Sequence, residues 1–195
     1  MARPPSDARA RLLTVAARQV RRAGAGSVTL DTVARETGCA KGLVTYHFGG
    51  RDQLLAAAAA ELFGGREADW RRALHAPAIE DAIQQVSRLL AAEAQDGFWR
   101  AWVSLSAEST KLTVQTVNNH WTGFVDLITA TLSEILEDHG LEATVSREEL
   151  GRLLAAGFQG LGLQLSAGGK PESVEGAHAA LWAAALSLTR PAGRR

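Results

Sequence analysis

GCAKGLVTYHFGGRD, residues 38–52, predicts a helix barely two turns long, with one glycine before it and another inside it. At 100° per residue, Val44 and Phe48 fall on one side of such a helix. The opposite side and its flank carry small and polar residues: Lys41, Gly42, Thr45 and Tyr46. One narrow face therefore packs inward, and the outward face offers a cation, a hydroxyl and a phenol to a partner. Gly42 keeps that outward face low, so that a partner can approach the backbone closely.

A second short helix precedes this one. Leu30, Val33 and Ala34 share one face of it, and Gly38 is placed to end it. Two short helices joined at a glycine turn predict a helix-turn-helix, whose second helix enters the major groove of DNA. The alternative interpretation is a surface helix with a chance aromatic residue.

The charge of the chain is unevenly distributed, although its formal net charge is zero over 195 residues. Residues 1–55 contain nine basic and four acidic side chains, which gives them a net charge of +5. Because the whole chain is neutral, residues 56–195 carry a net charge of −5. A basic head on an acidic body predicts that only the head meets a polyanion. A random split of the charges is the competing explanation.

Apolar residues recur at helical spacing through most of the chain, and the signal for strands is weak. We count nine expected helices and no sheet, which predicts an all-α fold. The fourth expected helix starts at Arg51 and is interrupted at Gly64-Gly65, where a kink or hinge is expected because each glycine costs about 1 kcal/mol in a helix interior. Ser146 and Glu149 have the spacing of a capping box.

Residues 29–55, TLDTVARETGCAKGLVTYHFGGRDQLL, resemble the N-terminal signature of the TetR (tetracycline-repressor-like) family. The matching positions are Thr29, Val33-Ala34, Gly38, Lys41-Gly42, Tyr46-His47-Phe48, Arg51-Asp52 and Leu54-Leu55. The resemblance implies a three-helix DNA-binding domain at residues 1–50 and a helical ligand-binding and dimerisation domain at residues 51–195. It also implies a homodimeric repressor that binds a pseudo-palindromic DNA operator and is released by a small-molecule effector.

Site residues carry over from this resemblance. The implied DNA-binding residues are Thr29, Lys41, Gly42, Leu43, Thr45, Tyr46, His47 and Arg51. Lysine can pair with guanine acceptors in the major groove, and threonine or tyrosine can meet a thymine methyl group. Thr29 and Arg51 are expected at phosphates. The chain departs from the family at Ala40, where serine or threonine usually caps the helix, and at Thr45, where the family's tyrosine usually stands.

The second domain is expected to supply a dimer surface from its last two helices. The residues concerned are Ala156, Gly157, Gly160, Leu161, Trp182 and Leu186. The small ones would let a partner helix approach, and the larger ones would supply apolar area. The competing explanation is that they fill the core of the single chain.

Aromatic and polar residues of the middle helices predict a small-molecule site, because such sites are mostly apolar with a few polar groups. The candidates are Trp99, Trp102, Ser106, His120, Trp121, Phe124, Phe158 and Gln159. Ordinary core packing is the alternative for each of them.

An enzyme has little support in the sequence. The histidines show no HExxH or paired metal spacing, and no phosphate-binding loop is complete. We therefore expect no catalytic residue, metal site or cofactor. The single cysteine and the lack of an apolar membrane-spanning run predict a cytoplasmic protein that has no membrane partner. Two alternatives stay open, namely an activator of the same family and a helical small-molecule carrier whose DNA head is vestigial.

Overall fold

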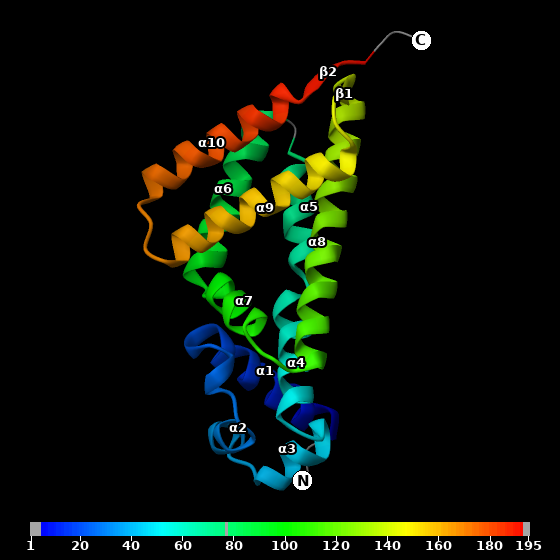
Figure 1. The fold of residues 1–195 in the computed structure, drawn as a ribbon. Helices are drawn as coiled ribbons and strands as arrows, with labels where there is room; N and C mark the ends of the chain where they lie inside the picture. Colours follow the sequence, from blue (N-terminus) through cyan, green and yellow to red (C-terminus); the bar gives the residue numbers. More distant parts are fainter. Residues whose placement is uncertain (1–4, 77, 193–195) are drawn as a thin grey trace. The chain divides into compact units, whose positions relative to one another are not determined.

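The computed structural model describes residues 5–76 and 78–192, and these residues are almost entirely helical (Figure 1). The helices are α1 (Pro5–Ala23), the 3-10 turn η1 (Ala25–Ser27), α2 (Leu30–Thr37), α3 (Lys41–Phe48), α4 (Arg51–Phe63), α5 (Arg66–Leu74), α6 (Ile79–Gln95), α7 (Phe98–Ser106), α8 (Lys111–Asp138), α9 (Arg147–Ser166) and α10 (Pro171–Ser187). The predicted all-α fold with an N-terminal helix-turn-helix is confirmed. Within the described ranges, no helix has the length and apolar character needed to cross a bilayer.

The prediction that the chain has no sheet is wrong in one small respect. Two three-residue strands, β1 (Leu141–Ala143) and β2 (Thr189–Pro191), pair antiparallel, with Glu142 opposite Arg190. The side chains of this pair also form an ion pair at 2.7 Å. Strands this short have no periodicity that a sequence pattern could reveal, because alternation needs at least four residues to show.

The expected interruption of the fourth helix is confirmed. α4 ends at Phe63 and α5 begins at Arg66, with Gly65 in the left-handed region at φ 84°. In the described part of the chain there are thus ten α-helices when α4 and α5 are counted separately, and nine when they are counted as two halves of one interrupted helix.

Contacts divide the chain into two compact units. Unit 1 comprises Met1–Gly64 and Asp96–His120, and unit 2 comprises Gly65–Gln95 and Trp121–Arg195. The boundary falls inside the Gly64-Gly65 break. The grouping by contacts differs from the functional boundary predicted at residue 50, which stays a prediction.

Unit 1 is built around α1, which packs against α2, α4 and α7. Its apolar face supplies Leu12, Ala16 and Val20, all nearly inaccessible to solvent. Gly97 allows α7 to begin close to α1, because a Cβ there would lie 2.6 Å from the carbonyl oxygen of Arg21. The small helices α2 and α3 are thus attached to a packed support.

Unit 2 is built around α9, which packs against α6 and α10. Phe158 and Leu154 of α9 are buried together with Trp70 of α5. The N-terminus of α9 has the predicted capping box, since the Ser146 side chain accepts from the Glu149 backbone N–H and the Glu149 carboxylate accepts from that of Ser146. The cap satisfies backbone donors that the first turn leaves unpaired.

Candidate nucleic-acid interface

α2 begins and ends at residues that suit a short, well-defined helix. Thr29 accepts a hydrogen bond from the Thr32 backbone N–H at 3.0 Å, and the Thr32 hydroxyl accepts one from the Thr29 backbone N–H at 2.9 Å. Gly38 ends the helix at φ 69°, a conformation that glycine adopts without strain. The turn directs the chain into α3, which begins three residues later at Lys41.

α3 buries one face and exposes the other, as the sequence predicts. Val44 and Phe48 are buried against the rest of unit 1, whereas Tyr46 is 81% exposed. Lys41, Gly42 and Thr45 share the exposed side. A Cβ built on Gly42 would meet no atom within 4 Å, so the backbone of α3 is open to an approaching partner at this point.

The polar groups of this exposed face make only weak contacts within the protein. The Lys41 ammonium pairs with Asp31 of α2 at 2.8 Å, and both side chains are more than half exposed. Such an exposed pair is worth no more than about 1 kcal/mol, so a phosphate or a base can compete for the lysine. The rings of Tyr46 and His47 lie edge to face at 5.2 Å, and His47 is half-buried.

The beginning of α3 lacks a side-chain cap, which agrees with the departure noted at Ala40. Its first backbone N–H groups therefore have no side-chain acceptor from that position. Free N–H groups at a helix N-terminus are good donors to phosphate oxygens. Leu43, the remaining residue assigned to this face, is half-buried.

Arg51 does not lie on the exposed face. Its Nε donates to the Val28 carbonyl at 2.9 Å, and its terminal nitrogens donate to the Glu108 carboxylate at 3.0 and 3.1 Å and to the Ala25 carbonyl at 3.0 Å. The Glu108 carboxylate raises the pKa of the guanidinium above its ordinary value. These contacts do not support the phosphate role predicted for Arg51, because each of its three donor nitrogens already has an internal partner.

A further ion pair, between Arg18 and Glu36, joins α1 to α2. Arg18 donates to the Glu36 carboxylate at 2.6 Å, and Gln19 donates to its other oxygen. The hydrogen bonds from Gln19 and Arg18 lower the pKa of Glu36 below its ordinary value. The orientation of α2, and through the glycine turn that of α3, is thus held by contacts behind the exposed face.

The sequence profile described as "Bacterial regulatory proteins, tetR family" matches residues 12–58, which include α1 from Leu12 onward, the helix-turn-helix and the first half of α4. Residues 12–58 are therefore similar to the TetR family. No curated protein matches the chain significantly.

Solved structures of TetR-family regulators share the fold across nearly the whole chain. One from Streptomyces coelicolor is 23% identical, with a TM-score of 0.74, over 94% of this chain and 96% of the other. One from Agrobacterium tumefaciens is 16% identical, with a TM-score of 0.75, over 96% of this chain and all of the other. The structure of a SmeT–triclosan complex is 15% identical, with a TM-score of 0.70, over 96% of this chain and 93% of the other. At these identities the similarity shows the fold alone.

The residues predicted for a ligand lie in both units of the chain. Trp99, Trp102, Ser106 and His120 belong to unit 1, whereas Trp121, Phe124, Phe158 and Gln159 belong to unit 2. In unit 1, the ring of Phe63 lies 5.0 Å from those of both Trp102 and His120. The Ser106 hydroxyl is turned back to the Trp102 carbonyl at 2.8 Å. In unit 2, Phe124 and Phe158 both pack on Trp70, at 4.9 and 5.2 Å.

The six residues predicted for the dimer surface also separate into two groups. Ala156 and Leu186 are exposed, and a Cβ on Gly160 would meet nothing within 4 Å. Leu161 and Trp182 are buried within the single chain. A Cβ on Gly157 would lie 2.4 Å from the Leu181 side chain, so this glycine lets α9 approach α10 of the same chain. Core packing, the competing explanation, therefore accounts for Gly157, Leu161 and Trp182.

The sequence pattern did not reveal two contributors to the geometry of the head. Glu108, whose carboxylate accepts from Arg51, lies 57 residues from Arg51 in sequence. Arg9 places its guanidinium 5.1 Å from the centre of the Phe48 ring. No local spacing predicts either contact, because both depend on how distant helices pack.

Proposed function

We propose that this chain is a homodimeric transcriptional repressor that binds a pseudo-palindromic DNA operator through α3 and leaves it when a small molecule binds. The observation that carries the proposal is the exposed side of α3. On this side, Tyr46 is 81% exposed, Lys41 makes only an exposed ion pair, and no atom lies within 4 Å of a Cβ built on Gly42. The other side of the helix is buried.

Lys41, Thr45 and Tyr46 would contact base edges, while Gly42 lets the backbone approach the groove floor. Leu43 would add apolar contact at the edge of this face. His47 and Thr29 would contact phosphates beside it, together with the uncapped N–H groups that open α3.

We propose that the dimer forms through exposed small and apolar residues of α9 and α10. On α9 these are Leu153, Ala156 and Gly160, spaced so that they share one face. On α10, Leu186 is 39% exposed and Ala179 and Ala183 are exposed on the same side. A two-fold dimer would present two copies of α3 to half-sites one helical turn, or a multiple of it, apart.

The effector is proposed to be a mostly apolar molecule that binds among the predicted aromatic side chains of one unit. In unit 1, Trp102 and His120 cluster around Phe63, and in unit 2, Trp121 lies beside Phe124, so each unit by itself offers an aromatic surface. A solved neighbour of the same fold is a complex with triclosan.

Selection from a random duplex DNA pool tests the DNA-binding part directly. We expect enrichment of a pseudo-palindrome that binds at least ~1000-fold more tightly than a scrambled duplex at fixed, near-physiological salt. Sedimentation of the free protein should show a dimer. If no sequence is enriched and all duplexes bind equally weakly, the regulator proposal is wrong and the small-molecule carrier is favoured. A reporter that compares a deletion strain with wild type then distinguishes repression from activation.

A further inference from the structure

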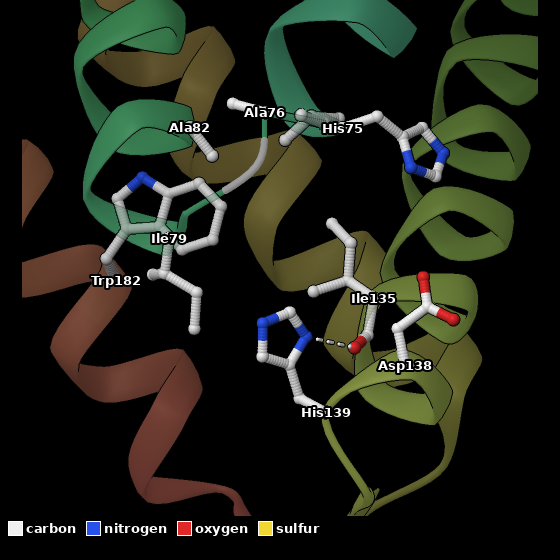
Figure 2. A pocket seen from close by; sticks show the side chains of 9 residues that line it. His75, Ala76, Ile79, Ala82, Ile135, Asp138, His139 and Trp182 are labelled. Atoms are coloured by element: carbon white, nitrogen blue, oxygen red, sulfur yellow. Dashed lines mark hydrogen bonds between the residues drawn. The ribbon is translucent and has the colours of Figure 1, made fainter.

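A cavity of about 300 Å³ lies within unit 2, and it contains none of the residues predicted for the effector (Figure 2). It is lined by α5, the start of α6, the end of α8 and α10. The lining residues are Leu74, His75, Ala76, Ile79, Ala82, Ile135, Asp138, His139 and Trp182. Small-molecule sites begin at about this volume, so the cavity suits a compound of one ring with a short chain.

The body of the cavity is apolar. Leu74, Ala82 and Trp182 are buried, and Ile79 and Ile135 are half-exposed. The indole N–H of Trp182 donates to Nε2 of His178 at 2.9 Å, so the ring contributes its apolar surface rather than its donor. Burial lowers the pKa of His178, which keeps that nitrogen an unprotonated acceptor.

The polar atoms along the cavity present acceptors. Nδ1 of His139 lies 2.9 Å from the Ile135 carbonyl oxygen, which can only accept, so Nδ1 carries the proton. In the neutral ring Nε2 is then an acceptor, and Figure 2 shows this second nitrogen turned toward the side of the cavity where Ile79 lies. Nε2 of His75 lies 2.8 Å from the Glu134 carboxylate, so this nitrogen is engaged outside the lining.

Charge at the end of α8 favours a positive group. α8 ends at Asp138, an exposed lining residue whose carboxylate lies on the other side of Ile135 from the His139 ring (Figure 2), and the last carbonyls of this 28-residue helix carry the negative end of its dipole. An anionic ligand would meet this carboxylate and these carbonyls unfavourably. A cation that donates hydrogen bonds matches both the charge and the acceptors.

We propose that this cavity binds small organic amines in their ammonium form. The apolar body lies against Trp182, Ile79 and Leu74. The ammonium group lies toward the end of α8, where it donates to Nε2 of His139 and is attracted by Asp138. The proposal concerns binding within unit 2 and holds whether or not the chain represses transcription.

Calorimetry on the full chain with three matched probes tests this. 2-Phenylethylamine should bind about fivefold more tightly than 2-phenylethanol, and 3-phenylpropanoate should bind more weakly than either. Asp138→Asn should reduce the amine's advantage to about twofold and leave the alcohol unchanged. Asp126→Asn, on the same helix but outside the lining, is the matched control and should change nothing. His139→Phe should weaken both the amine and the alcohol, because both donate to the lost nitrogen.

Ile79→Trp should fill the cavity and abolish binding of all three probes, with an unchanged circular dichroism spectrum and melting temperature. The proposal is wrong if the amine gives no heat at millimolar concentration or binds no better than the alcohol. It is also wrong if the amine's advantage survives Asp138→Asn, or if binding survives Ile79→Trp in the folded variant.

Discussion

Tyr46 of α3 is 81% exposed, whereas Trp70 of α5 is completely buried. Both are aromatic side chains with a single polar group, a hydroxyl in Tyr46 and an indole N–H in Trp70. The indole N–H of Trp70 donates to Glu93 at 2.9 Å, and Glu93 also accepts from Arg66 at 2.7 and 3.0 Å. In unit 2 the indole N–H of Trp70 thus has its hydrogen-bond acceptor inside the protein. In unit 1 the Tyr46 hydroxyl remains available to a partner.

The difference separates stability from binding. A buried aromatic residue with a satisfied N–H contributes to the free energy of folding, while an exposed phenol contributes almost nothing to it. Substitutions in the two places should therefore affect different measurements. The predictions below test that separation, beginning with the largest expected effect.

Glu93→Ala should destabilise the chain by about 3 kcal/mol. The substitution removes the acceptor of the Trp70 N–H and the carboxylate paired with Arg66, whose side chain is only 14% exposed. Urea unfolding measures the loss as a lower midpoint. Asp69→Asn on α5 is the matched control, because it breaks the exposed Asp69–Arg72 pair and should cost less than about 0.5 kcal/mol. Equal midpoints for Glu93→Ala and the control would contradict the structural role of this cluster.

Arg51→Gln and Glu108→Gln should each destabilise the chain by about 2 kcal/mol, since either leaves a charged partner in a partly buried site. The double variant should lose much less than the sum of the two. The decisive readout is the salt dependence of DNA binding. If Arg51 acts only through its internal partners, both variants keep the wild-type slope. A slope lower by about 0.9 in Arg51→Gln alone would show that Arg51 contacts a phosphate after all.

Much of unit 1 could be predicted because its signals are local. The glycine at residue 38, the Thr29 cap and the i, i+4 pair Val44 and Phe48 lie within 20 residues of one another, and each has a conformational reason. These signals predict two helices, the turn and the exposed face together. Arg51 is the exception, because nothing nearby in sequence indicates that Glu108 will fold against it.

Unit 2 was less predictable because its decisive contacts join distant residues. The apolar stripes predict helices, but Leu161 and Trp182 could equally face a partner or the core, and periodicity does not distinguish the two. The cavity depends on how α5, α6, α8 and α10 meet, so no motif marks it. The three-residue strands are too short to give a pattern at all.

Tyr46→Ala should weaken binding to the selected operator by more than about 1 kcal/mol and change the unfolding free energy by less than about 0.5 kcal/mol. Fluorescence anisotropy with labelled operator measures the first, and urea unfolding measures the second. Tyr46→Phe retains the ring and removes only the hydroxyl, so it divides the loss between stacking and hydrogen bonding. A large loss of stability in Tyr46→Ala would mean that the exposed phenol is structural, and the contrast with Trp70 would fail.

Gly42→Ala should have the smallest effect, and it should change stability and operator affinity in opposite directions. A Cβ at Gly42 meets nothing within 4 Å, so alanine should stabilise α3 by roughly 0.5 kcal/mol through its better helix propensity. The same methyl group would stand between the α3 backbone and the groove, and operator affinity should fall. Gly123→Ala in α8 is the matched control, since a Cβ there is equally unobstructed and Gly123 belongs to unit 2, outside the predicted DNA-binding residues. Both variants should gain stability, but only Gly42→Ala should lose affinity. If Gly42→Ala binds the operator as well as Gly123→Ala does, the backbone of α3 does not approach DNA closely, and glycine at position 42 has no role in recognition.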